Sequence, residues 1–271
     1  MHDKFLLISA ACYLVAAFLL FSAVTERSGN KRRLAAIITL IGVILHAWAQ
    51  TEHWIVPATP NASVLNVLSL CALATVAIPL STFPLRNSLF DAGLVVLPIS
   101  ALILIAEWAI SAPALESARY SPGMSIHIFT SIMAFGVLSI AAVYAVFVDQ
   151  IDRLLRKHSF NKLIQNLPAL DTLEKLLFHL IKAGFIVLTV SLFTGLIFVN
   201  DLFGQHLGHK TLLSIFAWLI FALVLWGRWK RGWRGRVAVR MTLAGIALLL
   251  LAYFGSKLIL EIFLQRSWHI L

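Results

Sequence analysis

Histidines are the residues of this chain whose type and placement most favour chemistry. The two strongest candidates of the nine, His46 and His127, lie inside long apolar stretches near the predicted outer surface. An ionisable side chain within a bilayer is by default a candidate functional group. Neutral imidazole is a common metal ligand and a standard axial ligand of haem iron. The alternative is a membrane histidine that only hydrogen-bonds a neighbouring helix, and the residue pattern leaves both interpretations open.

Other histidines give weaker signals. His179 is expected near the opposite membrane surface from His127, where it forms either a second, inner site or an interfacial contact. His206 and His209 have H-x-x-H spacing, but two nitrogens do not complete a metal site. The sequence contains no phosphate loop, nucleophile elbow or H-E-x-x-H motif. Hydrolase functions therefore have no support, and the chain is expected not to be an enzyme.

Two further side chains are candidates for contact with a bound ligand. Lys257 precedes Glu261 by four residues, so it is expected to form a helical ion pair, to extend toward the membrane surface, or to meet a haem propionate. Trp218 lies deeper in its apolar stretch than the other tryptophans. It is expected either to pack in the core or to face a ligand.

The elements that must position these residues are membrane helices. The chain of 271 residues is 60% hydrophobic and 13% charged, and its mean hydropathy is +0.90. A soluble domain is about 25% charged, which excludes a water-soluble globule. A spanning helix needs about 20 apolar residues. We predict spans at 5–24, 34–50, 64–82, 90–110, 125–148, 176–200, 212–228 and 237–263. The predicted fold class is all-α: a polytopic membrane bundle of about eight transmembrane helices, forming one domain over 1–271.

The distribution of basic residues predicts the orientation. The formal net charge is +10, and Lys and Arg concentrate in alternate connections, namely 25–33, 149–175 and 228–240. The intervening connections carry at most one basic residue each. Because Lys/Arg-rich loops stay in the cytoplasm, both termini are predicted to lie on the outer, periplasmic side. Membrane topology thus explains the basic charge, and no nucleic-acid partner is expected.

Several short stretches occur in a fixed order along the chain, at 45–47, 122–127, 167–175, 177–179, 232–236 and 251–256. Together they resemble the HemX-like branch of the cytochrome c assembly (CcsA/CcmC) family, and the resemblance covers nearly the whole chain. The family handles haem in the membrane and delivers it to apocytochromes c at the outer face. The resemblance implies that His127 is the first outer-face haem ligand. His46 and His179 are similar to histidines of this branch.

The chain departs from the family pattern at two places. The family's Trp-rich segment, W-G-x-x-W-x-W-D, is expected just before the seventh span, where residues 200–209 contain no Trp. The second outer histidine is expected after the last span in an H-S-Y-like context, where this chain has Arg266-Ser267-Trp268 and His269 is out of register. These departures favour a haem-binding or accessory role over a complete haem lyase.

Three hypotheses follow. The first is a bacterial inner-membrane protein that holds haem b near its outer face, with His46 and His127 as iron ligands and Lys257 or Arg119 at the propionates. Its partners would be haem, the lipid bilayer, and apocytochrome or other membrane assembly proteins. The second is a non-haem assembly factor on the same scaffold. The third is a small-solute or metal transporter, although no inverted repeat or pair of similarly broken helices occurs.

Overall fold

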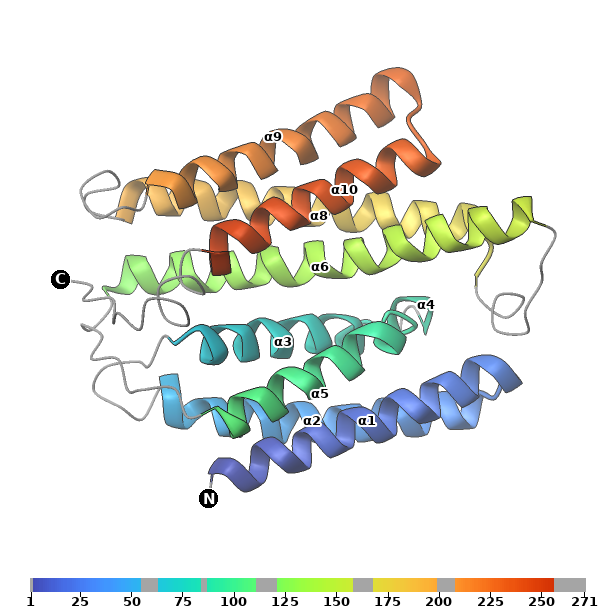
Figure 1. The fold of residues 1–271 in the computed structure, drawn as a ribbon, viewed down its shortest axis with the longest axis vertical. Helices are drawn as coiled ribbons and strands as arrows, with labels where there is room; N and C mark the ends of the chain where they lie inside the picture. Colours follow the sequence, from blue (N-terminus) through green and yellow to red (C-terminus); the bar gives the residue numbers. More distant parts are fainter. Residues whose placement is uncertain are drawn as a thin grey trace. The chain divides into compact units, whose positions relative to one another are not determined.

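The computed structural model of the chain is built from α-helices (Figure 1). It describes residues 2–54, 63–83, 87–110, 121–157, 168–198 and 208–255, and these ranges contain no strand. Seven helices in them are long and apolar enough to cross a membrane, and α5 (Gly93–Ala109) is a shorter apolar helix. The prediction of an all-helical bundle of about eight spans is confirmed.

A first compact unit contains the helices that precede residue 119. They are α1 (His2–Glu26), α2 (Gly29–Trp54), α3 (Val64–Ser81), the short α4 (Asn87–Phe90) and α5. Within this unit α1 packs on α2 and α5, and α3 packs on the same two helices. His46 therefore lies on a helix that has neighbours on two sides.

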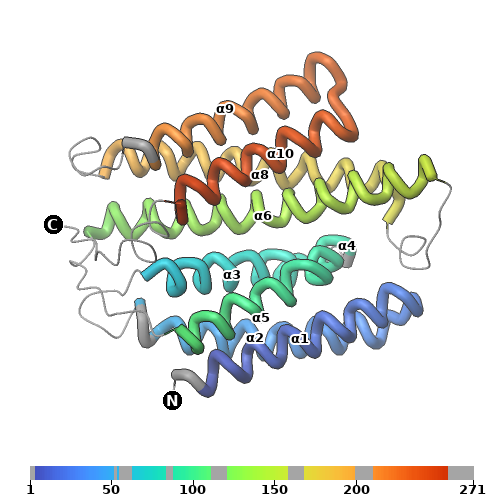
Figure 2. Tube along the Cα trace, viewed as in Figure 1, coloured from blue at the N-terminus to red at the C-terminus, as the bar shows by residue number. Residues whose placement is uncertain are grey.

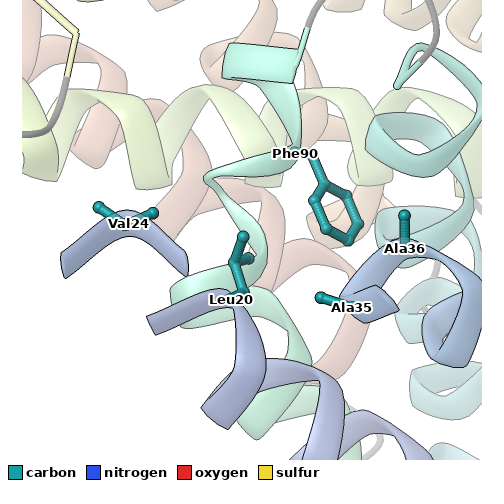
Figure 3. Close-up of a cluster of buried hydrophobic side chains, with 5 residues drawn as sticks. All are labelled: Leu20, Val24, Ala35, Ala36 and Phe90. Atoms are coloured by element: carbon teal, nitrogen blue, oxygen red, sulfur yellow. The ribbon is translucent and has the colours of Figure 1, made fainter. Parts of the chain in front are cut away.

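Small side chains allow α1 and α2 to approach near their connecting turn. A buried cluster there contains Leu20, Val24, Ala35, Ala36 and Phe90 (Figure 3). The two alanines lie on α2, and the Phe90 ring at the end of α4 packs against them. The chain leaves Phe90 through Asp91, whose carboxylate lies 2.9 Å from the Arg32 guanidinium of α2. Burial raises the pKa of Asp91 to about 6, although Arg32 acts to lower it.

A second compact unit contains the remaining helices, the first of them as far as Arg153. They are α6 (Pro122–Arg156), α8 (Leu170–Phe198), α9 (Gly208–Arg231), α10 (Gly235–Leu250) and a π-helical turn, η1 (Leu251–Gly255). Figure 2 follows α9 and α10 through their tight turn, and α9 also packs on α8 and η1. Glycines allow close contacts: a Cβ on Gly184 of α8 would lie 2.5 Å from Leu138 of α6.

Several predicted boundaries need correction. The connection predicted at 149–175 is shorter, because α6 continues to Arg156 and α8 begins at Leu170. Its helical ends are polar and are stabilised by pairs four residues apart, such as Arg153–Asp149 at 2.7 Å. The span predicted at 90–110 is divided between α4 and α5 by the turn at Asp91. The last span continues through α10 and η1 to Gly255, and the rest of its predicted range lies outside the described residues.

Candidate functional site

His127 lies near the start of α6, and the local sequence explains why the helix begins there. Pro122 occupies the first helical position, where its missing N–H is not needed. The Ser121 hydroxyl accepts a hydrogen bond from the Met124 backbone N–H at 3.3 Å, which is a helix-capping contact. His127 follows within the second turn of α6, at the helix end that the loop charges predict to be outer.

One hydrogen bond determines which nitrogen of the neutral His127 ring carries the hydrogen. Nδ1 lies 2.9 Å from the backbone carbonyl oxygen of Ser191 on α8. A carbonyl oxygen only accepts, so Nδ1 carries the hydrogen and Nε2 keeps its lone pair. Among the residues that the structure describes, none forms a hydrogen bond with Nε2. A histidine held through one nitrogen by a backbone carbonyl, with the other free to donate electrons, is the usual arrangement of a metal ligand.

The surroundings of His127 hold α6 and α8 together. The Ser131 hydroxyl donates to the His127 carbonyl at 2.7 Å and lies 2.7 Å from the Ser191 hydroxyl. Gly195 leaves space for the imidazole, because a Cβ there would lie 2.9 Å from His127 Cε1. His127 and Ser131 are four residues apart, as are Ser191 and Gly195, so each pair shares one helix face.

The turn η1 supplies aromatic residues to the same part of α6. The Tyr253 hydroxyl donates to the Ser131 carbonyl at 3.4 Å. Phe135, two turns along α6 from His127, contacts Tyr253 and Phe254 edge to face, at centroid distances of 5.6 and 5.7 Å. Single π-helical turns within a helix occur frequently at functional sites. Here the turn brings two rings and a hydroxyl toward the α6–α8 contact.

His46 belongs to a different, fully buried network in the first unit. Its side chain has 0% exposure. Nδ1 lies 3.2 Å from the Tyr13 hydroxyl of α1, and Nε2 lies 2.9 Å from the Ser69 hydroxyl of α3. Both ring nitrogens are therefore occupied by protein hydrogen bonds. Coordination of iron by His46 would require one of these bonds to be exchanged.

Gln50 and Glu107 complete this network. The Gln50 amide donates to Ser69 at 2.8 Å and to Glu107 of α5 at 3.3 Å, and its oxygen accepts from the Trp54 indole at 3.1 Å. The network therefore joins side chains of α1, α2, α3 and α5.

With both histidine environments defined, sequence comparisons identify the family. A sequence model of the family described as cytochrome C assembly protein matches residues 8–264. The chain belongs to the cytochrome c assembly family. It is 33% identical over 267 residues to the inner membrane protein YpjD of Escherichia coli (strain K12), covering 95% of this chain and 98% of that protein.

More distant relatives match less of the chain. A 28.8 kDa protein from the nifR3-like 5′ region of Azospirillum brasilense is 29% identical over 221 residues, covering 81% of this chain and 77% of that protein. The cytochrome c biogenesis protein CcsA of Prochlorococcus marinus (strain MIT 9303) is 30% identical over 96 residues, covering 35% of this chain and 30% of that protein. The family predicted from short motifs is therefore confirmed. The likeness to an inner membrane protein and the seven long apolar helices establish a multi-pass inner-membrane protein.

Two other predicted site residues of this family member lie apart from His127. His179 of α8 donates from Nδ1 to the Lys175 carbonyl of its own helix at 2.7 Å. It is twelve residues from Ser191, or about 18 Å along the helix. The Trp218 indole donates to Thr189 of α8 at 2.9 Å and stacks on Phe185. Thr189 is two residues from Ser191, about 200° around the helix, so Trp218 contacts a face of α8 other than the one that holds His127.

The remaining predicted residues lie outside the described residues. They are Lys257, Glu261, Arg119 and His206, and the side chain of His209 is also not described. Within the described ranges, no group of three or more His, Cys, Asp or Glu side chains converges as a metal site would require. Four residues at these two sites were not predicted, namely Ser69, Ser131, Ser191 and Gly195. Small or polar residues inside an apolar stretch are a weak signal, because they are also common at ordinary membrane helix contacts.

Proposed function

We propose that the chain holds haem b near the outer face of the inner membrane, in a role that supports cytochrome c assembly, with His127 Nε2 as an axial iron ligand. Family membership supports a haem-related assembly role. The observation that carries the finer proposal is the 2.9 Å hydrogen bond from His127 Nδ1 to the Ser191 carbonyl. It leaves Nε2 as the unprotonated nitrogen, the form that binds iron.

The residues around His127 fit such a ligand. The Ser191 carbonyl orients the ring and increases the electron density that Nε2 can donate. Gly195 provides the space in which the ring is held against α8. Phe135, Tyr253 and Phe254 supply the apolar and aromatic surface that haem sites use to exclude water. Haem, when bound, supplies the iron and two propionates, and no covalent chemistry is required of the protein.

His46 is the second predicted iron ligand. Its two nitrogens are hydrogen-bonded to Tyr13 and Ser69, so in the arrangement described it acts as a structural link between α1, α2 and α3. Iron binding at His46 remains a prediction that involves breaking one of these bonds. We expect the H46A substitution to destabilise the first unit, whereas H127A should remove bound haem together with the α6–α8 hydrogen bond to the Ser191 carbonyl.

The remaining assignments are extensions of this proposal. Lys257 is proposed to pair with a haem propionate, since a cationic group near the outer end of the last span would favour a carboxylate. Trp218 is proposed to support α8 through its contacts with Thr189 and Phe185, and His179 is proposed as a separate inner site that does not hold this haem. CcsA relatives are named for cytochrome c biogenesis, so an apocytochrome at the outer face is the proposed recipient of the haem.

Absorbance spectroscopy tests the proposal. Full-length protein is purified in detergent from haem-replete cells, and haem is quantified by its Soret band and by the pyridine haemochrome assay. We expect bound haem in the parent, at least tenfold less in H127A, and parental levels in H179A. H179A is the matched control, because the His179 ring bonds only its own helix among the described residues. Haem retained equally by H127A would overturn the assignment. Absence of haem in the parent, even after reconstitution, would favour the non-haem assembly factor.

A further inference from the structure

The α9–α10 turn of the second unit carries a surface rich in cations and indoles. Arg231 ends α9, residues 232–234 form the turn, and Gly235 begins α10. We use the name basic–indole surface for the exposed side chains Trp226, Trp229, Lys230 and Arg231 of α9 together with the exposed Arg240 of α10. The Trp229 side chain is 76% exposed and that of Trp226 is 45% exposed. The loop charges predict that this end of α9 lies at the cytoplasmic side.

Each exposed indole has a cation beside it. Lys230 Nζ lies 4.2 Å from the centroid of the Trp229 ring, and Arg231 Cζ lies 5.4 Å from the centroid of the Trp226 ring. Both distances are within the range of cation–π attraction. The pairing keeps each positive charge next to an apolar ring, so the surface presents charge and an interfacial aromatic group together.

The cations of this surface differ from neighbouring basic residues in whether a carboxylate lies close to them. Arg234 lies 3.8 Å from Glu174, and Arg236 lies 3.6 Å from Asp152. By contrast, Lys230, Arg231 and Arg240 have no carboxylate within 4.0 Å among the residues that the structure describes. Among the described residues, these three cations of the surface therefore have no carboxylate within salt-bridge distance.

The turn that carries the surface is held by specific contacts. Gly232 and Gly235 have positive φ values of 63° and 54°, which glycine adopts without strain. The Trp233 backbone N–H donates to the Gly227 carbonyl at 3.2 Å, and Arg228 donates to the Trp233 carbonyl at 3.3 Å. Arg228 also lies over the Phe178 ring of α8, at 4.5 Å. The cations of the surface therefore lie on two helices whose connecting turn is held by hydrogen bonds and by the Arg228–Phe178 contact.

We propose that the basic–indole surface is a binding site for the headgroup of an anionic phospholipid. Three cations with no acidic partner among the described residues match phosphate charge, and basic residues beside a membrane helix attract anionic lipids. The two exposed indoles favour a lipid over a free phosphate ion, because tryptophan side chains prefer the membrane–water interface. The helix that carries them is also one of the apolar spans. This inference is independent of haem binding.

Lipid selectivity of the full-length protein tests the site. Delipidated protein is titrated with phosphatidylglycerol or phosphatidylcholine, and bound lipid is counted by native mass spectrometry. The test variant is K230Q/R231Q/R240Q. The matched control is K31Q/R153Q/K175Q, which removes the same charge from cations that each lie within 4.0 Å of a carboxylate. We expect the parent and the control to prefer phosphatidylglycerol, and the test variant to lose roughly tenfold or more of that preference.

Three outcomes would overturn the proposal. The first is a parent protein that does not distinguish the two lipids. The second is an equal loss of preference in the control variant, which would show that only net charge matters. The third is displacement of phosphatidylglycerol by millimolar inorganic phosphate, which would make this a general anion site. Circular dichroism of both variants verifies that the helices are retained, so a loss confined to the folded test variant supports the site.

Discussion

Substitution of Gly195 by alanine tests the His127 environment, because it fills the space beside the imidazole ring without changing the ring itself. A Cβ at Gly195 would lie 2.9 Å from His127 Cε1, 3.2 Å from Nδ1 and 3.6 Å from Nε2. Carbon atoms in favourable contact are about 3.5–4.0 Å apart. In G195A the ring must therefore move by roughly half an ångström or more. This movement strains the 2.9 Å hydrogen bond to the Ser191 carbonyl.

The magnitude follows from the cost of overpacking, which is about 1–3 kcal/mol in a well-packed site. If holding the ring in its ligating position incurs that cost, haem affinity falls by roughly 5- to 150-fold. Alanine is also a better helix former than glycine, by up to about 1 kcal/mol. The global stability of G195A should therefore change less than its haem affinity.

The assay is a haem titration followed at the Soret band, with thermal unfolding measured on the same samples. G29A is the matched control, because a Cβ at Gly29 would have nothing within 4 Å. We expect parental affinity in G29A and weaker binding in G195A. An unchanged dissociation constant and spectrum in G195A would refute the claim that this contact positions the ligand.

Three further predictions concern stability, measured as the free energy or midpoint of unfolding in detergent. S69A should destabilise the protein by about 1–3 kcal/mol, because it leaves buried polar groups of His46 and Gln50 without their partner. S81A, at an exposed serine of the same helix, should have little effect. Equal destabilisation by the two substitutions would contradict the role of the hydrogen-bond network. Asp91 has a folded-state pKa of about 6 against 3.8, so its stabilising contribution is complete below pH 3.8 and is lost as the pH rises through 6. The parent should therefore lose stability relative to D91N over that interval, and parallel pH profiles would refute this. E174A removes the side chain that accepts the Gly235 N–H at 3.0 Å, and it should lower the free energy of unfolding by about 1 kcal/mol. D171A, at an exposed position of the same helix, should lower it less. An unfolding midpoint of E174A equal to that of D171A would contradict this capping role.

The sequence was most informative about the membrane helices, because the length and apolarity of a span are local properties. The predicted span at 64–82, for example, differs from α3 by one residue. The division of the fourth span was not predicted. It depends on Asp91 being buried beside Arg32, which lies 59 residues earlier in the chain.

The candidate site was predictable only in part, for a similar reason. His127 was identified from its type, its depth and the family motif that contains it. Its partner is a backbone carbonyl 64 residues away, a group that every residue possesses. The role of Gly195 depends on the close approach of α8 to α6. The role of Ser69 depends on a hydrogen-bond network to which four helices contribute side chains. Tertiary packing determines these contacts, and a single sequence gives little signal for them.

Chemical rescue tests the central claim, that His127 Nε2 binds haem iron, most directly. The H127G variant replaces the imidazole with a small space, and millimolar imidazole is then added while the Soret and visible bands are recorded. The account predicts that H127G loses the parental spectrum, that imidazole restores it, and that H179G retains it without imidazole. A parental spectrum and haem stoichiometry in H127G alone would contradict the account.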